Sequence, residues 1–142
     1  MVFLFLYNMY SYRVYLKLMT IQINYKNNNS IKTSSNLVLF VDEKFNIGAI
    51  KKYISNNEFS YISDLLKNSD LKKDLLSFDI NSKKTIFLVS IKKDSNALDI
   101  ENLGAKFHSY INHNKKKDYY VNSDSVNNKI ENFVGHFLHG VK

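Results

Sequence analysis

A buried strand that leads directly into an amphipathic helix is the strongest structural signal in this sequence. Residues 85–91, TIFLVSI, are rich in the β-branched and aromatic side chains that favour strands. After a short charged turn, Asn96 can cap a helix, with Asp99 and Glu101 favourably placed in its first turn. The expected buried face of this helix consists of Ile100, Leu103, Phe107 and Ile111.

The same alternation of strand and helix recurs on both sides of this unit. Strands are predicted at residues 20–25, where apolar and polar side chains alternate, and at residues 36–41, a continuous apolar run. A third short strand is predicted at residues 118–122. Apolar residues with helical spacing predict helical segments over residues 47–54 and 62–66. Residues 71–80 fit a strand by one set of apolar positions and a helix by another.

A final amphipathic helix closes the chain, and Ser125 is its expected N-cap. Its apolar positions recur with helical spacing, at Ile130, Phe133, Val134, Phe137, Leu138 and Val141. Strands that alternate with helices in this way predict an α/β fold, a three-layer sandwich. We expect a mostly parallel (mixed) sheet with helices on both of its faces.

The length of 142 residues supports one domain with a sizeable core. We assign residues 19–142 to this domain, because Met19 opens a segment with strand-like alternation. Residues 1–18 are interpreted as a non-native or poorly ordered extension, with an additional edge strand as the alternative. They lack the basic start, long apolar stretch and cleavage site of a secretory signal, and no apolar run is long enough to span a membrane.

The composition argues against disulfides, thiolate metal sites and nucleic-acid binding. There is no cysteine, which is typical of a reducing, cytoplasmic location. The formal charge is +7, but Arg13 is the only arginine, and arginine is the preferred side chain for bidentate phosphate and guanine contacts. The basic run at residues 115–117 is expected to be a solvated turn. We therefore expect no nucleic-acid or membrane partner.

The histidines are the only candidate metal ligands or bases. His136 and His139 are three residues apart, a spacing that can bring two imidazoles to one metal ion, but no acidic residue lies one turn away from them. A solvent-facing or interface pair is the preferred interpretation. His108 and His113 are five apart and point in different directions on one helix.

The acidic residues and the glycines do not form a recognisable site. Asp64, Asp70, Asp74 and Asp79 share no period, whereas general acid–base catalysis needs two groups held together. The four glycines are isolated, so no phosphate-binding loop is present. Gly104 and Gly135 fall inside predicted helices, where close helix packing would compensate for their low helix propensity. We predict no catalytic, cofactor-binding or metal-binding residue in this chain.

In their order, the predicted elements resemble the N-terminal domain of the leucyl aminopeptidase (cytosol aminopeptidase) family. Three segments carry the resemblance: NLVLFVDEKFNIGAIKKYISNNEF at residues 36–59, KKTIFLVSIKKDSNALDIENLGAKFHSYI at residues 83–111, and ENFVGHFLHGVK at residues 131–142. The chain departs from the family in two places. Residues 90–93 replace a glycine-rich turn after the central strand, and Ser60-Tyr61 replaces a Gly-Lys pair.

The resemblance implies a macro-domain-like fold and a noncatalytic role in assembly or regulation. In that family the domain precedes a catalytic domain that binds two divalent metals (zinc, manganese or magnesium) and releases N-terminal amino acids from peptides. The motifs that hold those metals do not occur in these 142 residues, so we expect a fragment or a truncated product without the catalytic domain. The implied partners are the catalytic domain of the same polypeptide and further copies of the chain, in a hexamer.

Two other functions remain open at this point. The first is a stand-alone, macro-like ligand-binding module with a crevice at the carboxyl ends of its strands. The second is a nonspecific polyanion binder that uses residues 115–117, which predicts strongly salt-dependent affinity.

Overall fold

The centre of the fold is a four-stranded mixed sheet in the strand order β2-β3-β1-β4. In the computed structural model, residues 21, 23, 36–113, 118–127 and 130–142 are described. Strand β1 (Asn36–Asp42) pairs in parallel with β3 (Lys84–Ile91) and with the short β4 (Tyr119–Val121). Strand β2 (Leu75–Asn81) pairs with β3 in the antiparallel direction. The α/β class and the mixed sheet are thus confirmed.

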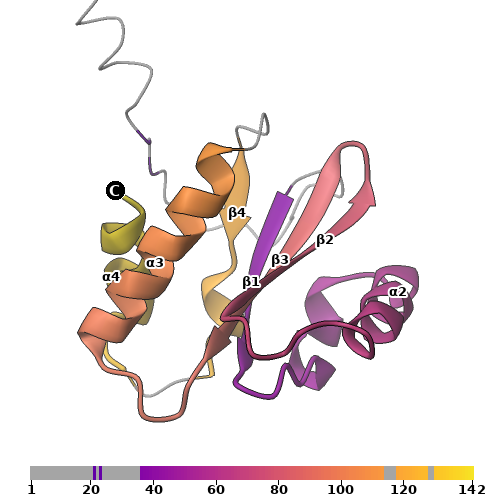
Figure 1. Cartoon of the computed structure of the whole chain (residues 1–142), viewed down its shortest axis with the longest axis horizontal. Helices are drawn as coiled ribbons and strands as arrows, with labels where there is room; N and C mark the ends of the chain where they lie inside the picture. Colours follow the sequence, from indigo (N-terminus) through magenta and orange to yellow (C-terminus); the bar gives the residue numbers. More distant parts are fainter. Residues whose placement is uncertain (1–20, 22, 24–35, 114–117, 128–129) are drawn as a thin grey trace, which may run out of the picture.

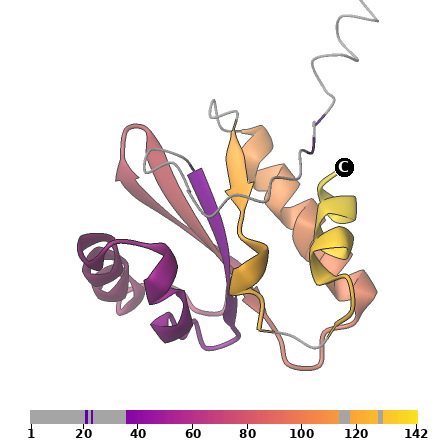
Figure 2. The ribbon, with the colours of Figure 1, turned by 180° about the vertical axis from the view of Figure 1, so that it is seen from behind.

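Helices lie on both faces of the sheet (Figure 1). The 3₁₀ helix η1 (Gly48–Tyr53) and helix α2 (Asn56–Leu66) lie on one face, and α3 (Ala97–Asn112) and α4 (Phe133–Val141) lie on the other. Figure 2 shows the same arrangement from behind, with the short 3₁₀ helix η2 (Ser123–Ser125) directly after β4.

Strands β1 and β3 are buried on both faces, because each continuous apolar run supplies two cores. Val38, Phe40, Phe87 and Val89 contact α3 and α4, whereas their neighbours along each strand contact η1 and α2. Alternate residues of a strand point to opposite faces, so an uninterrupted apolar run suits a strand covered on both sides. The core on the α3 and α4 side is rich in aromatic rings, with Phe40 edge-on to Phe133 and Phe137 at centroid distances of 5.0 and 5.1 Å.

Helix α2 begins with a capping box that the sequence analysis overlooked. The Ser55 hydroxyl accepts a hydrogen bond from the Glu58 N–H (3.2 Å), and the Glu58 carboxylate accepts one from the Ser55 N–H (2.8 Å). The two predicted helical segments are therefore a 3₁₀ helix and an eleven-residue α-helix, and Ser55 lies between them as the N-cap of the second. Asn96 caps α3 as predicted, in a second capping box with Asp99.

Ser125 is not the N-cap of the final helix, and this prediction is wrong. Helix α4 begins at Phe133, after Asn132 in a left-handed conformation (φ 53°). The buried Ser125 hydroxyl instead accepts a hydrogen bond from the Phe40 N–H (2.9 Å) and donates one to the Asn122 carbonyl (2.7 Å). Because β4 has only three residues, the Phe40 N–H needs another acceptor at this point, and Ser125 supplies it.

Strand β2 resolves the ambiguous segment at residues 71–80, because it begins at Leu75 and continues to Asn81. The turn between β2 and β3 is built on Asn81, whose side-chain oxygen accepts from the N–H groups of Lys83 (2.8 Å) and Lys84 (2.9 Å). The predicted strand at residues 20–25 lies mostly outside the described residues. Of that segment, Ile21 packs against the core beneath α3 and α4.

Helices α3 and α4 cross closely at two glycines. A Cβ atom at Gly104 would overlap the backbone oxygen of Phe137, and one at Gly140 would overlap the backbone of Glu101. The prediction of close helix packing is confirmed for Gly104. It is wrong for Gly135, where a Cβ atom would meet the side chain of Asn132, the N-cap residue of the same helix.

This crossing predicts that Gly104→Ala destabilises the fold, although alanine is the better helix former. Two helix backbones would have to move apart, so we expect a net loss of about 1–3 kcal/mol in the free energy of unfolding. Urea denaturation followed by circular dichroism measures this loss. Gly48→Ala is the matched control, because a Cβ atom there meets only the Asn46 side-chain oxygen at 3.3 Å. Equal stability of the Gly104→Ala variant and the wild type would contradict the close crossing.

Candidate functional site

The topology places a crevice at the carboxyl ends of β1 and β3. These two strands are parallel neighbours, but the chain leaves β1 toward η1 and α2 on one face and leaves β3 toward α3 on the other. Adjacent parallel strands whose connections diverge in this way form a topological switch point, where open α/β sheets bind ligands.

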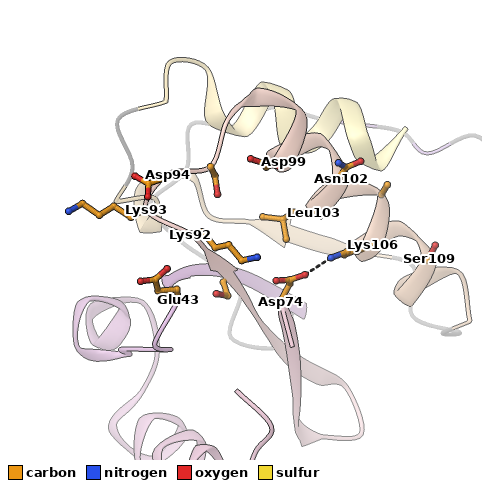
Figure 3. Close-up of a pocket in the computed structure, with 13 residues that line it drawn as sticks. Glu43, Asp74, Lys92, Lys93, Asp94, Asp99, Asn102, Leu103, Lys106 and Ser109 are labelled. Atoms are coloured by element: carbon orange, nitrogen blue, oxygen red, sulfur yellow. Dashed lines mark hydrogen bonds and ion pairs between the residues drawn. The ribbon is translucent and has the colours of Figure 1, made fainter. Parts of the chain in front are cut away.

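An open groove of about 890 Å³ lies at this position (Figure 3). The end of β3 lines one side of the groove, and α3 forms the opposite wall, with Leu103 pointing from α3 into the groove. Lys92 extends along the groove toward Asp74 and Lys106, whereas Lys93 extends away from it. The lining residues are Glu43, Asp74, Ser90, Lys92, Lys93, Asp94, Ser95, Asp99, Asn102, Leu103, Ala105, Lys106 and Ser109.

Several polar groups of the groove already have structural partners. Asp74, at the start of β2, forms an ion pair with Lys106 of α3. Asp99 belongs to the capping box of α3, and the Ser90 N–H donates to the Asp74 carbonyl (2.8 Å). Glu43, Lys92 and Asp94 are exposed to solvent. The groove therefore has mixed charge, and the charges of Asp74 and Lys106 neutralise each other.

The structure brings His136 and His139 together with an acidic residue, Glu101, from the neighbouring helix. The Nδ1 atoms of His136 and His139 lie 3.3 and 3.4 Å from the same Glu101 carboxylate oxygen. The sequence analysis searched for an acidic residue only within the final helix and so missed this one, which the α3–α4 crossing supplies. Helix α3 also carries His108, and His113 is its C-cap residue.

Within the described ranges, no group of three or more histidine, cysteine, aspartate or glutamate side chains has an arrangement that could hold a metal ion. The Glu101–His136–His139 cluster is thus a contact between two helices. The exposed side chain of His139 and the half-buried one of His136 agree with the expected interface or solvent-facing pair.

Tyr119, at the start of β4, has an uncommon environment for a polar group. Its hydroxyl is buried and has no hydrogen-bond partner among the described residues. Burial raises the pKa of Tyr119, and the neighbouring Tyr110 raises it further. At neutral pH the phenol therefore stays protonated. Its ring packs edge-on against Phe87 and Phe107, which indicates a core residue.

Lys84 and Glu58 form a buried ion pair between β3 and the start of α2. Their charged atoms are 2.6 Å apart, with the side chains 7% and 14% exposed. Burial acts to raise the pKa of Glu58, but hydrogen bonds from Lys84 and Ser55 and the Lys84 charge outweigh it, so that the pKa is lowered overall. Glu58 joins the helix cap to the sheet. It lies on the α2 face of the sheet and does not line the groove.

The basic run at residues 115–117 lies outside the described residues. Asp64 pairs with Lys67 on the surface of α2, and Asp79 accepts a hydrogen bond from the Thr85 hydroxyl (2.5 Å), so neither takes part in the groove. None of the helices in the described ranges has both the length and the apolar character needed to cross a membrane.

Comparisons with protein-family models, with curated proteins and with solved structures gave no match to this chain.

The Glu58–Lys84 pair predicts a specific pH dependence of stability. Because the pKa of Glu58 is lower in the folded state, its contribution is complete above the pKa of the unfolded state and is lost as the pH falls through the folded-state value. We expect the wild type to be more stable than Glu58→Gln at pH 7 and this difference to shrink under acidic conditions. Urea denaturation at a series of pH values measures it. A difference that stays constant down to pH values of about 2–3, well below ordinary carboxyl pKa values, would contradict the assignment.

Proposed function

We propose that this chain is a noncatalytic N-terminal domain of a leucyl-aminopeptidase-like enzyme, with a role in assembly or regulation. In this proposal the fold is a three-layer, macro-domain-like sandwich, and the reactive half of the enzyme is a separate catalytic domain. That domain would bind two divalent metal ions and release N-terminal amino acids from peptides. A cytoplasmic location and a hexameric assembly belong to the same proposal.

The order of the elements supports the relationship. Strand β1 with the helical segment after it, strand β3 with helix α3, and the closing helix α4 follow one another in the order of the elements that the resemblance implies. The three segments that carry the resemblance fall on β1 with η1 and the start of α2, on β3 with α3, and on α4. They thus include the two central strands and the helix pair.

The observation that carries the noncatalytic role is the use of charged groups in the groove. Acid–base catalysis needs a carboxyl, imidazole or amine held within hydrogen-bond reach of a substrate. The Asp74–Lys106 pair and the Asp99 capping box instead connect α3 with β2 and with its own N-terminus. These contacts stabilise the fold and engage Asp74, Lys106 and Asp99 in structural roles.

The groove itself supports a second candidate, a stand-alone ligand-binding module. It lies at the switch point where α/β sheets bind ligands. Against this candidate, the turn after β3 has no glycine-rich loop that would let a ligand approach the backbone.

Purified chain incubated with leucyl-p-nitroanilide and Mn²⁺ tests the first proposal. We expect no release of p-nitroaniline above the buffer blank, and calorimetry with ADP-ribose should show no binding heat. Turnover that co-purifies with the chain would contradict the noncatalytic role. Saturable ADP-ribose binding would favour the ligand-binding module instead.

A further inference from the structure

The charged side chains of the groove are distributed unequally along its length (Figure 3). Glu43 and Asp94 lie at the end formed by the loop after β1 and the turn between β3 and α3. Toward the other end lies the ion pair of Asp74 with Lys106, and Lys92 extends from the turn toward this pair. Two ammonium groups thus approach one carboxylate. One end of the groove is therefore acidic, and the other carries a net positive charge.

Three of these charged side chains are free to contact a ligand. Glu43, Lys92 and Asp94 are exposed, and their side chains have no hydrogen-bond or ion-pair partner among the described residues. Asp99 is engaged in the capping box of α3, where it adds negative charge near the acidic end. Lys93 extends away from the groove and leaves the acidic end uncompensated from within.

The α3 wall offers neutral contacts between the two charged ends. Asn102 is exposed on this wall, and its side-chain amide can both donate and accept hydrogen bonds. Leu103 points into the groove, and the small side chain of Ala105 leaves space beside it. The middle of the groove therefore suits an uncharged chain that joins two charged groups.

The separation of the charged ends sets the length of such a ligand. Asp94 precedes Ala97, the first residue of α3, and Lys106 lies nine residues further along the helix. At a rise of 1.5 Å per residue, these nine residues correspond to about 13 Å. An extended chain of three residues spans about 10 Å, and a long lysine side chain covers the remaining distance. An α-amino acid, whose two charged groups share one carbon atom, is too short.

We propose that this groove binds an elongated zwitterion, a molecule with an ammonium group at one end and a carboxylate at the other. The ammonium group contacts Glu43 and Asp94, and the carboxylate contacts Lys92 and Lys106. Short peptides with free termini and ω-amino acids share this chemistry. ADP-ribose does not fit, because it has two anionic phosphates and no cationic group for the acidic end.

This inference does not rest on the relationship to leucyl aminopeptidases or on a macro-like ligand, because it uses only the side chains of the groove. A zwitterion that binds without being cleaved would leave the noncatalytic role intact. A chain that binds no zwitterion would leave that role equally unaffected, since release of p-nitroaniline is a separate measurement.

Titration of the ¹⁵N-labelled chain with trialanine at low ionic strength, followed through amide chemical shifts, tests the proposal. Exposed charges form weak pairs, so we expect a Kd of about 0.1–1 mM. Saturable shifts should fall on the amides of residues 92–95 and 102–109. The same titration with 8-aminooctanoate, which lacks amide groups, distinguishes the two sources: binding of either ligand supports the proposal, and tighter binding of trialanine assigns a contact to its amides. No saturable shift of these amides with either ligand at about 10 mM would overturn it.

Blocked peptides and lysine variants test the two charged ends separately. N-acetyl-trialanine and trialanine amide each lack one charge, so each should bind at least threefold more weakly than trialanine. Lys92→Gln should weaken trialanine by a similar factor and leave trialanine amide unchanged, because the amide has no carboxylate for Lys92 to contact. Lys93→Gln is the matched control, with the same change of net charge outside the groove, and it should bind trialanine like the wild type. Equal binding of free and blocked peptides, or equal losses in the two lysine variants, would overturn the proposal.

Discussion

The parallel pairing of β1 with β3 is the interaction on which the rest of the structure depends. The two strands are hydrogen-bonded from Leu37 and Ile86 to Asp42 and Ile91, and their apolar residues are buried on both faces. Every other element packs on this pair or extends it. Helices α3 and α4 cover one face, η1 and α2 cover the other, and β2 and β4 are added at the two edges. Loss of this pairing would separate the two strands against which both hydrophobic cores pack.

Polar groups fix the edges of this central pair. The buried amide of Asn36 donates to the Asp118 carbonyl (3.0 Å) and accepts from the Thr85 N–H (3.0 Å), so one side chain joins the starts of β1, β3 and β4. The Ser125 hydroxyl joins the segment after β4 to β1 by accepting a hydrogen bond from the Phe40 N–H. Glu58 and Lys84 join the cap of α2 to the start of β3. These contacts satisfy backbone and charged groups that would otherwise be buried without partners.

The sequence predicts the central elements well, because their signals are local. The apolar runs of β1 and β3 and the Asn96 cap of α3 each require only neighbouring residues. Predictions failed where a side chain has a partner far away in the chain. Ser125 resembles an N-cap, but its hydroxyl is used by Phe40, 85 positions away. The Ser55–Glu58 capping box lies between neighbouring residues, yet it falls between the two helical segments predicted at residues 47–54 and 62–66, so the start of α2 at Asn56 was missed.

The candidate site shows the same division between local and distant contacts. The groove follows from the order and direction of the strands, which the alternating pattern predicts in outline. The contents of the groove do not follow from that pattern, because Asp74 and Lys106 come from elements that meet only in the folded chain. Likewise, Glu101 meets His136 and His139 only because Gly104 and Gly140 allow α3 and α4 to approach closely.

Native-state amide hydrogen exchange is the most direct test of the central role of β1 and β3. If the whole fold depends on this pair, the slowest amides should lie in β1 and β3, and they should exchange only by global unfolding, with the free energy that denaturation gives. Amides of α2 and β2 should exchange faster, through partial opening. The account would be contradicted if the β1 and β3 amides exchanged through local opening while helices on either face remained protected.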